Sequence, residues 1–209
     1  MDPKDDPLPT LAASPMLLDD LVPQYDATRI EHRVVAGTLP AVYAAIIDAD
    51  FVQAWKGNAA VRALFAARTT AEELLSRVRG GDVGSPPEMA SLRPAEMTEH
   101  GEWVRLGALP PHEIAFGVIG RFWAGETTWK TIDADEFADF SEPGYAKIGC
   151  NFSLRHYGRE RTLISYEART KATDDDSRRH FLRYWKAASP GAGIVMRSML
   201  AVVDPGVRR

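Results

Sequence analysis

Hydrophobic and polar residues alternate strictly in the stretch TRIEHRVV, residues 28–35. A period of two residues is typical of a β-strand with one buried face. Ile30, His32 and Val34 share one face of this strand, and charged residues occupy the other. The alternation therefore predicts a strand whose apolar face, with His32 on it, points into the protein.

The pattern changes to a helical one after Thr38. Apolar residues recur at positions 39, 42, 43, 46 and 47, which is the spacing of an amphipathic helix. Thr38 can cap this helix, and Pro40 falls in the first turn, where its missing N–H costs nothing. Further helical pieces are predicted at 59–67 and 71–78, and the stretch RGGDVGSPPE, residues 79–88, predicts a loop.

Five stretches rich in β-branched and aromatic residues follow this loop and predict strands. The connections between them are short, and this requires antiparallel neighbours because a parallel crossover needs a dozen or more residues. In the fourth stretch alternate side chains are apolar, so one face of the sheet is expected to be buried and the other wet. The five stretches are EWVRLGAL, EIAFGVIGRFW, TTWKTI, YAKIGCNFSLRHY and TLISYEARTKA.

The last segment is predicted to be a long helix over residues 174–203. Thr173 and Asp176 form a start that resembles a capping box. An apolar stripe passes through Pro190 without losing its phase, which indicates one helix kinked at Pro190. Two helices broken at residues 189–191 are the alternative. The stripe consists of Phe181, Tyr184, Trp185, Ala188, Ala192, Val195, Met199 and Val202.

The predicted order of elements is a strand, helices, a run of antiparallel strands and a long apolar helix. Over roughly residues 24–203 the chain resembles the START-like superfamily, also called SRPBCC, which includes polyketide cyclases/dehydrases and lipid-transport proteins. The resemblance implies an α+β helix-grip fold, in which a curved antiparallel sheet of about six to seven strands wraps around the C-terminal helix. It rests on the stretches YDATRIEHRVVAGTLPAVYAAI, GVIGRFW, PGYAKIGCNFSL and RTLISYEARTKATDDDSRRHFLRYW.

The resemblance also implies a function, because members of the superfamily hold an apolar small molecule between the sheet and the C-terminal helix. The expected function is the binding or carriage of a hydrophobic, lipid-like or polyketide-like molecule, with no cofactor. The superfamily has no common catalytic motif, so no catalytic residue is carried over. Two alternatives stay open: a cyclase/dehydratase-type enzyme with His32 and Tyr166 as acid and base, and a protein-interaction module of the co-chaperone type.

Composition narrows the class of protein further. The net charge of −4 argues against a nucleic-acid binder. The acidic, proline-rich start lacks the features of a signal peptide, and no apolar run is long enough to span a membrane. These features predict a cytoplasmic protein with a flexible arm at 1–23, one domain at 24–203 and a tail at 204–209. A homodimer stays open.

Six residues are candidates for lining the cavity. His32 is the polar handle, because its predicted face is the inner one and its ordinary pKa suits proton exchange near neutrality. Tyr166 alternates with Ile164 and Ala168, so its hydroxyl is expected to face inward. The mouth of the cavity is expected near the kink and the 79–88 loop. The candidates are His32, Phe116, Trp129, Phe152, Tyr166 and Tyr184.

Other chemistry finds little support in the sequence. The five histidines show no metal-ligand spacing, so no metal site is expected. The single cysteine, Cys150, is expected to be a small buried residue and not a nucleophile. Glu167 and Arg169 fall on the opposite face from Tyr166 and are expected to form a solvated ion pair.

Overall fold

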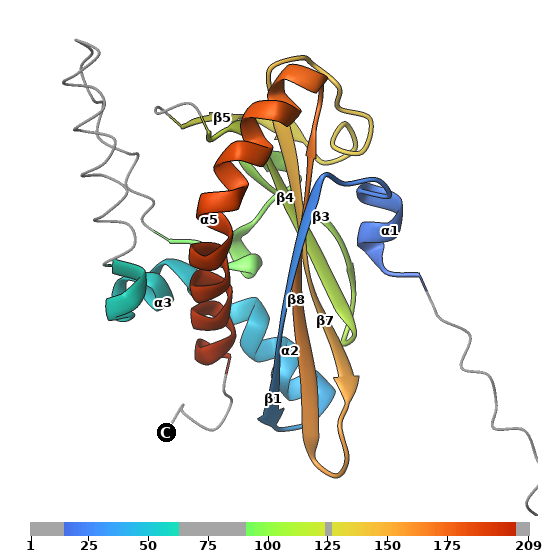
Figure 1. The fold of residues 1–209 in the computed structure, drawn as a ribbon. Helices are drawn as coiled ribbons and strands as arrows, with labels where there is room; N and C mark the ends of the chain where they lie inside the picture. Colours follow the sequence, from blue (N-terminus) through green and yellow to red (C-terminus); the bar gives the residue numbers. More distant parts are fainter. Residues whose placement is uncertain (1–14, 63–90, 124–126, 204–209) are drawn as a thin grey trace, which may run out of the picture.

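One antiparallel sheet forms the centre of this α+β protein, and its strands follow the spatial order β1-β8-β7-β4-β3, with β5 paired to the far part of β4 (Figure 1). The computed structural model describes residues 15–62, 91–123 and 127–203. The helix predicted at 71–78 and the loop predicted at 79–88 lie outside these residues. The strands are β1 (Ala27–Ala36), β3 (Trp103–Leu109), β4 (Glu113–Arg121), β5 (Thr128–Lys130), β7 (Ala146–His156) and β8 (Arg161–Ala172), and a separate small pair joins β2 (His100–Gly101) to β6 (Ile132–Asp133).

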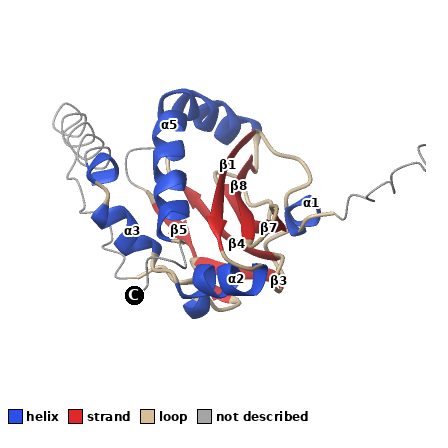
Figure 2. Cartoon of the chain, turned by 90° about the horizontal axis from the view of Figure 1, so that it is seen from below, coloured by secondary structure: helices blue, strands red, loops and turns tan. Residues whose placement is uncertain are grey.

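Helices cover the two faces of the sheet unequally. The long helix α5 (Asp175–Val202) lies on one side of the sheet together with α2 (Leu39–Asp48) and α3 (Phe51–Gly57), and we call this side the inner face. The short helix α1 (Leu17–Leu21) lies on the opposite side, the outer face (Figure 2). The predicted α+β class, the six-stranded antiparallel sheet and the long C-terminal helix are confirmed. The sequence pattern did not reveal α1, which falls in the stretch expected to be a flexible arm.

Helix α5 is continuous through Pro190, which confirms the prediction of a single helix and excludes two helices. Figure 2 shows that the helix bends along its length. Its first turn is fixed by Asp174, whose carboxylate accepts hydrogen bonds from the backbone N–H groups of Asp176 and Ser177, each at 2.9 Å. The other carboxylate oxygen accepts from Gly144 N–H at 2.7 Å, so the cap also ties the helix to the turn before β7.

Gly193, three residues after Pro190, lets β1 approach the helix closely. Gly193 is buried, and a Cβ built on it would overlap the guanidinium of Arg29. Arg29 donates to the carbonyl oxygen of Ser189 at 3.1 Å and to the carboxylate of Glu31 at 2.7 Å. Arg197, one helical turn further, donates to the same Glu31 oxygen at 2.9 Å. The small residues in this part of the helix thus make room for a charged cluster between helix and strand.

This cluster reverses the predicted orientation of β1. Ile30 and Val34 are 44% and 39% exposed, and His32 is exposed on the outer face with them. The prediction that His32 points inward is wrong. Arg29 and Glu31 take the inner face instead, because α5 supplies partners for both charges and so removes the usual penalty for covering them.

The outer face also departs from the expectation of a wet surface. The Glu167 and Arg169 side chains form the expected ion pair, at 2.7 Å, but they are only 7% and 8% exposed. Helix α1 covers them and supplies Asp19 to Arg169 at 2.9 Å and the Leu18 carbonyl at 3.0 Å. A second apolar cluster forms beneath α1 and around residues 132–145, so this part of the outer face is a second core. Its buried members are Val22, Val104, Ile119, Ile132 and Phe137.

A double-mutant cycle tests the contact between β1 and the helix. Alanine is a better helix former than glycine, so Gly193→Ala alone would favour folding by about 1 kcal/mol. The added methyl group, however, also displaces the Arg29 guanidinium. We expect Gly193→Ala to be more favourable in an Arg29→Ala background than in the native chain, with a coupling of about 1 kcal/mol measured by urea denaturation. Gly57→Ala is the matched control, because a Cβ there meets no atom within 4 Å. If Gly193→Ala changes the unfolding free energy equally in both backgrounds, Gly193 and Arg29 are not in contact.

The cap of α5 predicts a pH dependence of stability. Hydrogen bonds from the Ser177 and Gly144 backbone N–H groups and the Ser177 hydroxyl hold the pKa of Asp174 well below its usual range. An unfolded aspartate titrates near pH ~3.9, so the charged cap stabilises the fold above about pH 4, and this contribution is lost as the pH falls toward the lower folded-state pKa. Asp174→Asn keeps a capping oxygen without the charge. The difference in unfolding free energy between native and variant protein should shrink below about pH 4; a constant difference down to about pH 2 would contradict this.

Candidate functional site

Aromatic side chains gather on the inner face of the central strands. Phe152 stacks on Tyr166 with ring centroids 4.4 Å apart, and Phe51 of α3 stacks on Phe152 at 5.3 Å. Phe116 lies 5.9 Å from Phe152 and 5.9 Å from Trp103, which is only partly buried. The aromatic group therefore runs from the buried centre of the sheet to the surface at Trp103.

Tyr166 and Cys150 form a buried polar contact within this group. The two residues lie on neighbouring strands, with Cys150 opposite Ala168 and Phe152 opposite Tyr166. Burial raises the pKa of the Cys150 thiol to about 12, although the hydrogen bond with Tyr166 opposes this shift. Burial also raises the pKa of Tyr166 well above its ordinary value, and the Cys150 sulfur adds to the effect. Both groups therefore stay protonated and neutral near neutral pH.

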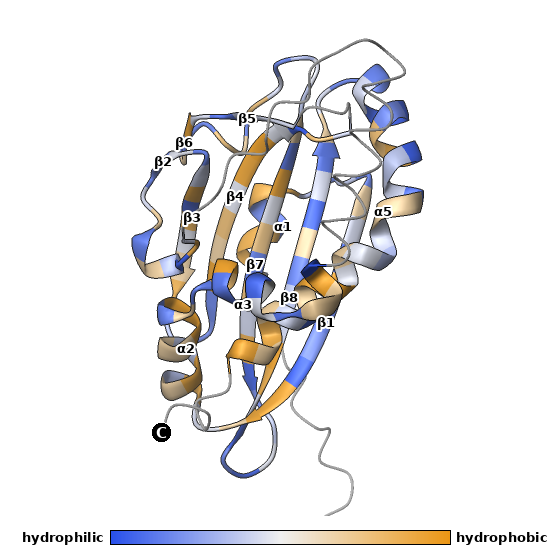
Figure 3. Cartoon of the chain, turned by 90° about the vertical axis from the view of Figure 1, so that its left-hand side faces the viewer, coloured by the Kyte–Doolittle hydropathy of each residue, from blue (hydrophilic) through white to orange (hydrophobic). Residues whose placement is uncertain are grey.

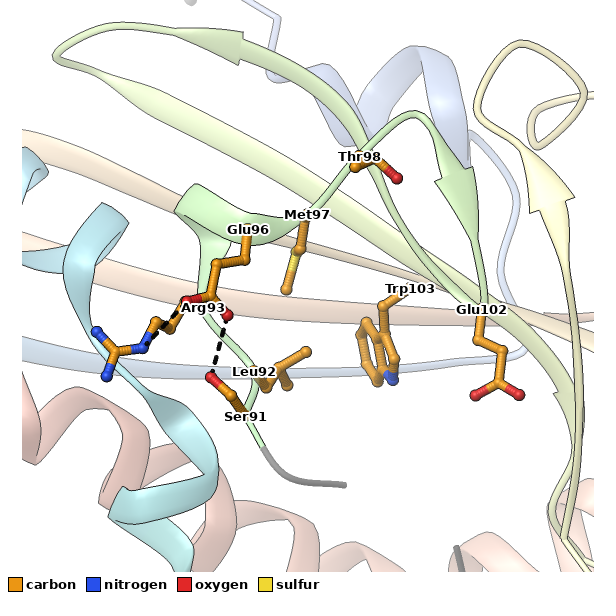
Figure 4. Close-up of a pocket in the computed structure, with 8 residues that line it drawn as sticks. All are labelled: Ser91, Leu92, Arg93, Glu96, Met97, Thr98, Glu102 and Trp103. Carbon is orange, nitrogen blue, oxygen red and sulfur yellow. Dashed lines mark hydrogen bonds and ion pairs between the residues drawn. The ribbon is translucent and has the colours of Figure 1, made fainter. Parts of the chain in front are cut away.

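A pocket of about 380 Å³ opens beside Trp103 (Figure 4). It lies where the chain passes from Ser91 through the 3₁₀ turn η1 (Pro94–Glu96) to β3. The side chains of Leu92, Met97 and Trp103 point toward one another and form its apolar wall. Its lining residues are Ser91, Leu92, Arg93, Glu96, Met97, Thr98, Glu102 and Trp103.

Arg93 and Glu96 at the rim of this pocket are already paired. Arg93 lies 3.5 Å from Glu96 and 3.8 Å from Asp50. Glu96 also accepts a hydrogen bond from the Ser91 hydroxyl at 3.2 Å. The apolar wall, in contrast, continues inward, because Leu92 and Met97 belong to the same buried cluster as Phe116. The pocket is thus an open recess with one apolar wall and a polar rim, on which Glu102 has no ion-pair partner among the described residues.

The six residues predicted to line the cavity lie in three places. Phe116, Phe152 and Tyr166 come together in the aromatic group described above. Trp129 and Tyr184 belong to a different cluster around Phe122, near the start of α5. His32 lies on the outer face, where its Nδ1 is 2.8 Å from the Ser165 hydroxyl. His32 and Tyr166 therefore point to opposite faces, and the acid and base pair of the enzyme alternative is not assembled.

Sequence reasoning missed the residues of the pocket itself. Leu92 and Met97 flank a 3₁₀ turn, which is too short to show an apolar period. Trp103 begins a predicted strand, but its partly exposed position depends on the turn before it. The sequence MASLRPAEM, residues 89–97, combines three large apolar residues with a proline and was the one available signal. Among the described residues, no group of three His, Cys, Asp or Glu side chains is placed to hold a metal ion.

No protein-family model and no curated protein matches the chain. Similar solved structures include a conserved protein from Geobacillus kaustophilus, with 10% identity and a TM-score of 0.39 over 85% of this chain and 92% of that one. The Zhui aromatase/cyclase from Streptomyces sp. R1128 has 10% identity and a TM-score of 0.28, covering 84% and 93%. CalU16 from Micromonospora echinospora has 10% identity and a TM-score of 0.27, covering 84% and 83%. These likenesses concern the general fold and carry no statement about activity.

The architecture itself defines the class of protein. A six-stranded antiparallel sheet in the order β1-β8-β7-β4-β3, with α5 following the last strand and packing on the inner face, is an α+β helix-grip fold. This is the fold that the resemblance to the START-like superfamily implied.

The buried contact between Tyr166 and Cys150 predicts an unreactive thiol. A thiol with a raised pKa and no exposure forms almost no thiolate near neutral pH. Iodoacetamide at about pH 8 should leave Cys150 of the native protein unmodified while it alkylates the denatured protein fully, as measured by intact mass. Native alkylation as fast as that of the denatured chain would contradict the buried position.

Proposed function

We propose that this protein binds an apolar small molecule in the pocket beside Trp103, against the apolar wall formed by Leu92, Met97 and Trp103. The observation that carries the proposal is the continuity of apolar side chains from Leu92, Met97 and Trp103 to Phe116. Ligand pockets are mostly apolar with a few placed polar groups, and typical volumes run from ~300 to ~1,000 Å³. A volume of about 380 Å³ is at the small end of that range.

The rim supports a ligand with an uncharged polar end. Arg93 already has Glu96 and Asp50 as partners, so a ligand carboxylate would have to compete with two carboxylates for one guanidinium. The Ser91 and Thr98 hydroxyls donate to Glu96 and to the His100 carbonyl, so each can still accept a hydrogen bond from a ligand O–H or N–H. A ligand built of an apolar ring or chain with a hydroxyl or other neutral donor at its end fits this lining.

Binding of N-phenyl-1-naphthylamine, a neutral apolar fluorophore, tests the proposal. We expect the native protein to bind it at micromolar concentration, because the ring can stack on Trp103, which lines the pocket and is partly exposed. Trp103→Ala removes the outer wall and should weaken the affinity at least about tenfold, since a buried aromatic contact contributes roughly 1.5–3 kcal/mol.

Trp129→Ala is the matched control for this experiment. It removes another partly buried tryptophan of the same sheet, but one that packs in the cluster around Phe122. Its affinity for the fluorophore should stay within about twofold of the native value. Equal losses in both variants, or fluorescence that rises only when the protein begins to unfold, would exclude the pocket as the binding site.

A further inference from the structure

The outer face of the sheet is covered by α1 over only part of its length. Leu17 of α1 lies above Gly107, and Arg169 contacts the Leu18 carbonyl. Near the β7–β8 hairpin, Leu163 of β8 lies between Val34 of β1 and Arg155 of β7. These side chains share the outer face, and Val34 and Arg155 are exposed. The end of the sheet that carries the β7–β8 hairpin therefore presents an uncovered outer surface.

Two turns meet at this end. β4 pairs with β7 so that Glu113 is opposite Ser153, and the Leu154 N–H donates to the His112 carbonyl at 2.8 Å. The β3–β4 turn is thereby attached to the side of the β7–β8 hairpin. Figure 1 shows this hairpin projecting beyond the other described elements, and Figure 3 shows its tip as hydrophilic.

The two most exposed large apolar side chains among the described residues belong to these turns. Leu109, at the end of β3, is 52% exposed, and Tyr157, in the hairpin, is 47% exposed. Val34 on the neighbouring edge strand adds a third, at 39%. Together with three exposed arginines of the hairpin they form what we call the outer patch: Val34, Leu109, Arg155, Tyr157, Arg159 and Arg161.

The outer patch is cationic although the whole chain is acidic. Residues 155–161 read RHYGRER and contain three arginines and one glutamate, in a chain with a net charge of −4. Arg161 lies over the Tyr157 ring, 5.2 Å from its centroid. Within the described ranges, no carboxylate forms an ion pair with Arg155 or Arg159. The cations are thus available to an anionic partner.

We propose that the outer patch docks on an anionic lipid surface. A second copy of the chain would bring arginines against arginines, which is unfavourable for a self-complementary contact. A surface that binds another protein typically has a contiguous apolar centre with a polar rim. In the outer patch the apolar side chains are instead separated by arginines. Arginines at lipid phosphates, with tyrosine and leucine inserted between headgroups, fit that arrangement. Among the described residues, no helix is both long and apolar enough to cross a bilayer.

Sedimentation with lipid vesicles tests this proposal on the full chain. Vesicles of phosphatidylcholine with about 30% phosphatidylserine should bind the protein at low salt, and binding should weaken as salt screens the charges. Pure phosphatidylcholine vesicles should bind at least about tenfold more weakly. The double variant Arg155→Glu/Arg159→Glu should lose at least about tenfold in affinity for the anionic vesicles, and Leu109→Ser/Tyr157→Ser should bind more weakly with the salt dependence kept.

The matched control is Arg121→Glu/Arg183→Glu, which changes the net charge equally at exposed positions outside the outer patch. It should bind the anionic vesicles within about threefold of the native protein. Equal losses in the two charge variants would show a general charge effect and overturn the proposal. Absence of binding to both kinds of vesicle, or a dimer in sedimentation equilibrium that only the patch variants dissociate, would also overturn it. None of these outcomes depends on whether the pocket beside Trp103 binds a ligand.

Discussion

The guanidinium of Arg169 needs a partner for each N–H that is withdrawn from water, and this requirement determines how the outer face is built. Glu167 supplies one carboxylate from the same strand, and α1 supplies Asp19 and the Leu18 carbonyl. A buried charge without partners costs several kcal/mol. Helix α1 therefore both covers this charge and supplies its partners. Gly149 lets the helix come close, because a Cβ there would overlap Val22 and crowd Leu18.

The same principle operates on the inner face at β1. Charged residues usually point to solvent, and that rule placed Arg29 and Glu31 outside in the sequence analysis. The rule fails because α5 supplies the Ser189 carbonyl to Arg29 and the Arg197 guanidinium to Glu31, from 160 and 166 residues further along the chain. Alternation correctly gave the strand and its period, but it could not give which side is inner, because the distant partners decide it. The apolar period across Pro190 succeeded because helical phase is a local property.

The sequence predicted the inward-facing residues of the candidate site correctly only where they lie on a central strand of the sheet. Phe116, Phe152 and Tyr166 lie on β4, β7 and β8, whose neighbours on both sides leave one orientation for each residue. Trp129 belongs to the three-residue strand β5 at the margin of the sheet, and Tyr184 to the first half of α5. Both pack around Phe122 instead. The positions of Trp129 and Tyr184 depend on the angle at which α5 crosses the sheet. The sequence pattern does not predict that angle.

The contacts of α1 and β1 also impose an order on folding. Among the described strands β1 pairs only with β8, and the Leu17 N–H reaches a carboxylate 96 residues further along the chain. During synthesis on the ribosome both elements emerge long before their partners exist. Contacts between distant residues form slowly, because the intervening chain must close a loop first. α1 and β1 are therefore secured only after β4 and β8 have been translated, although both precede those strands in the chain.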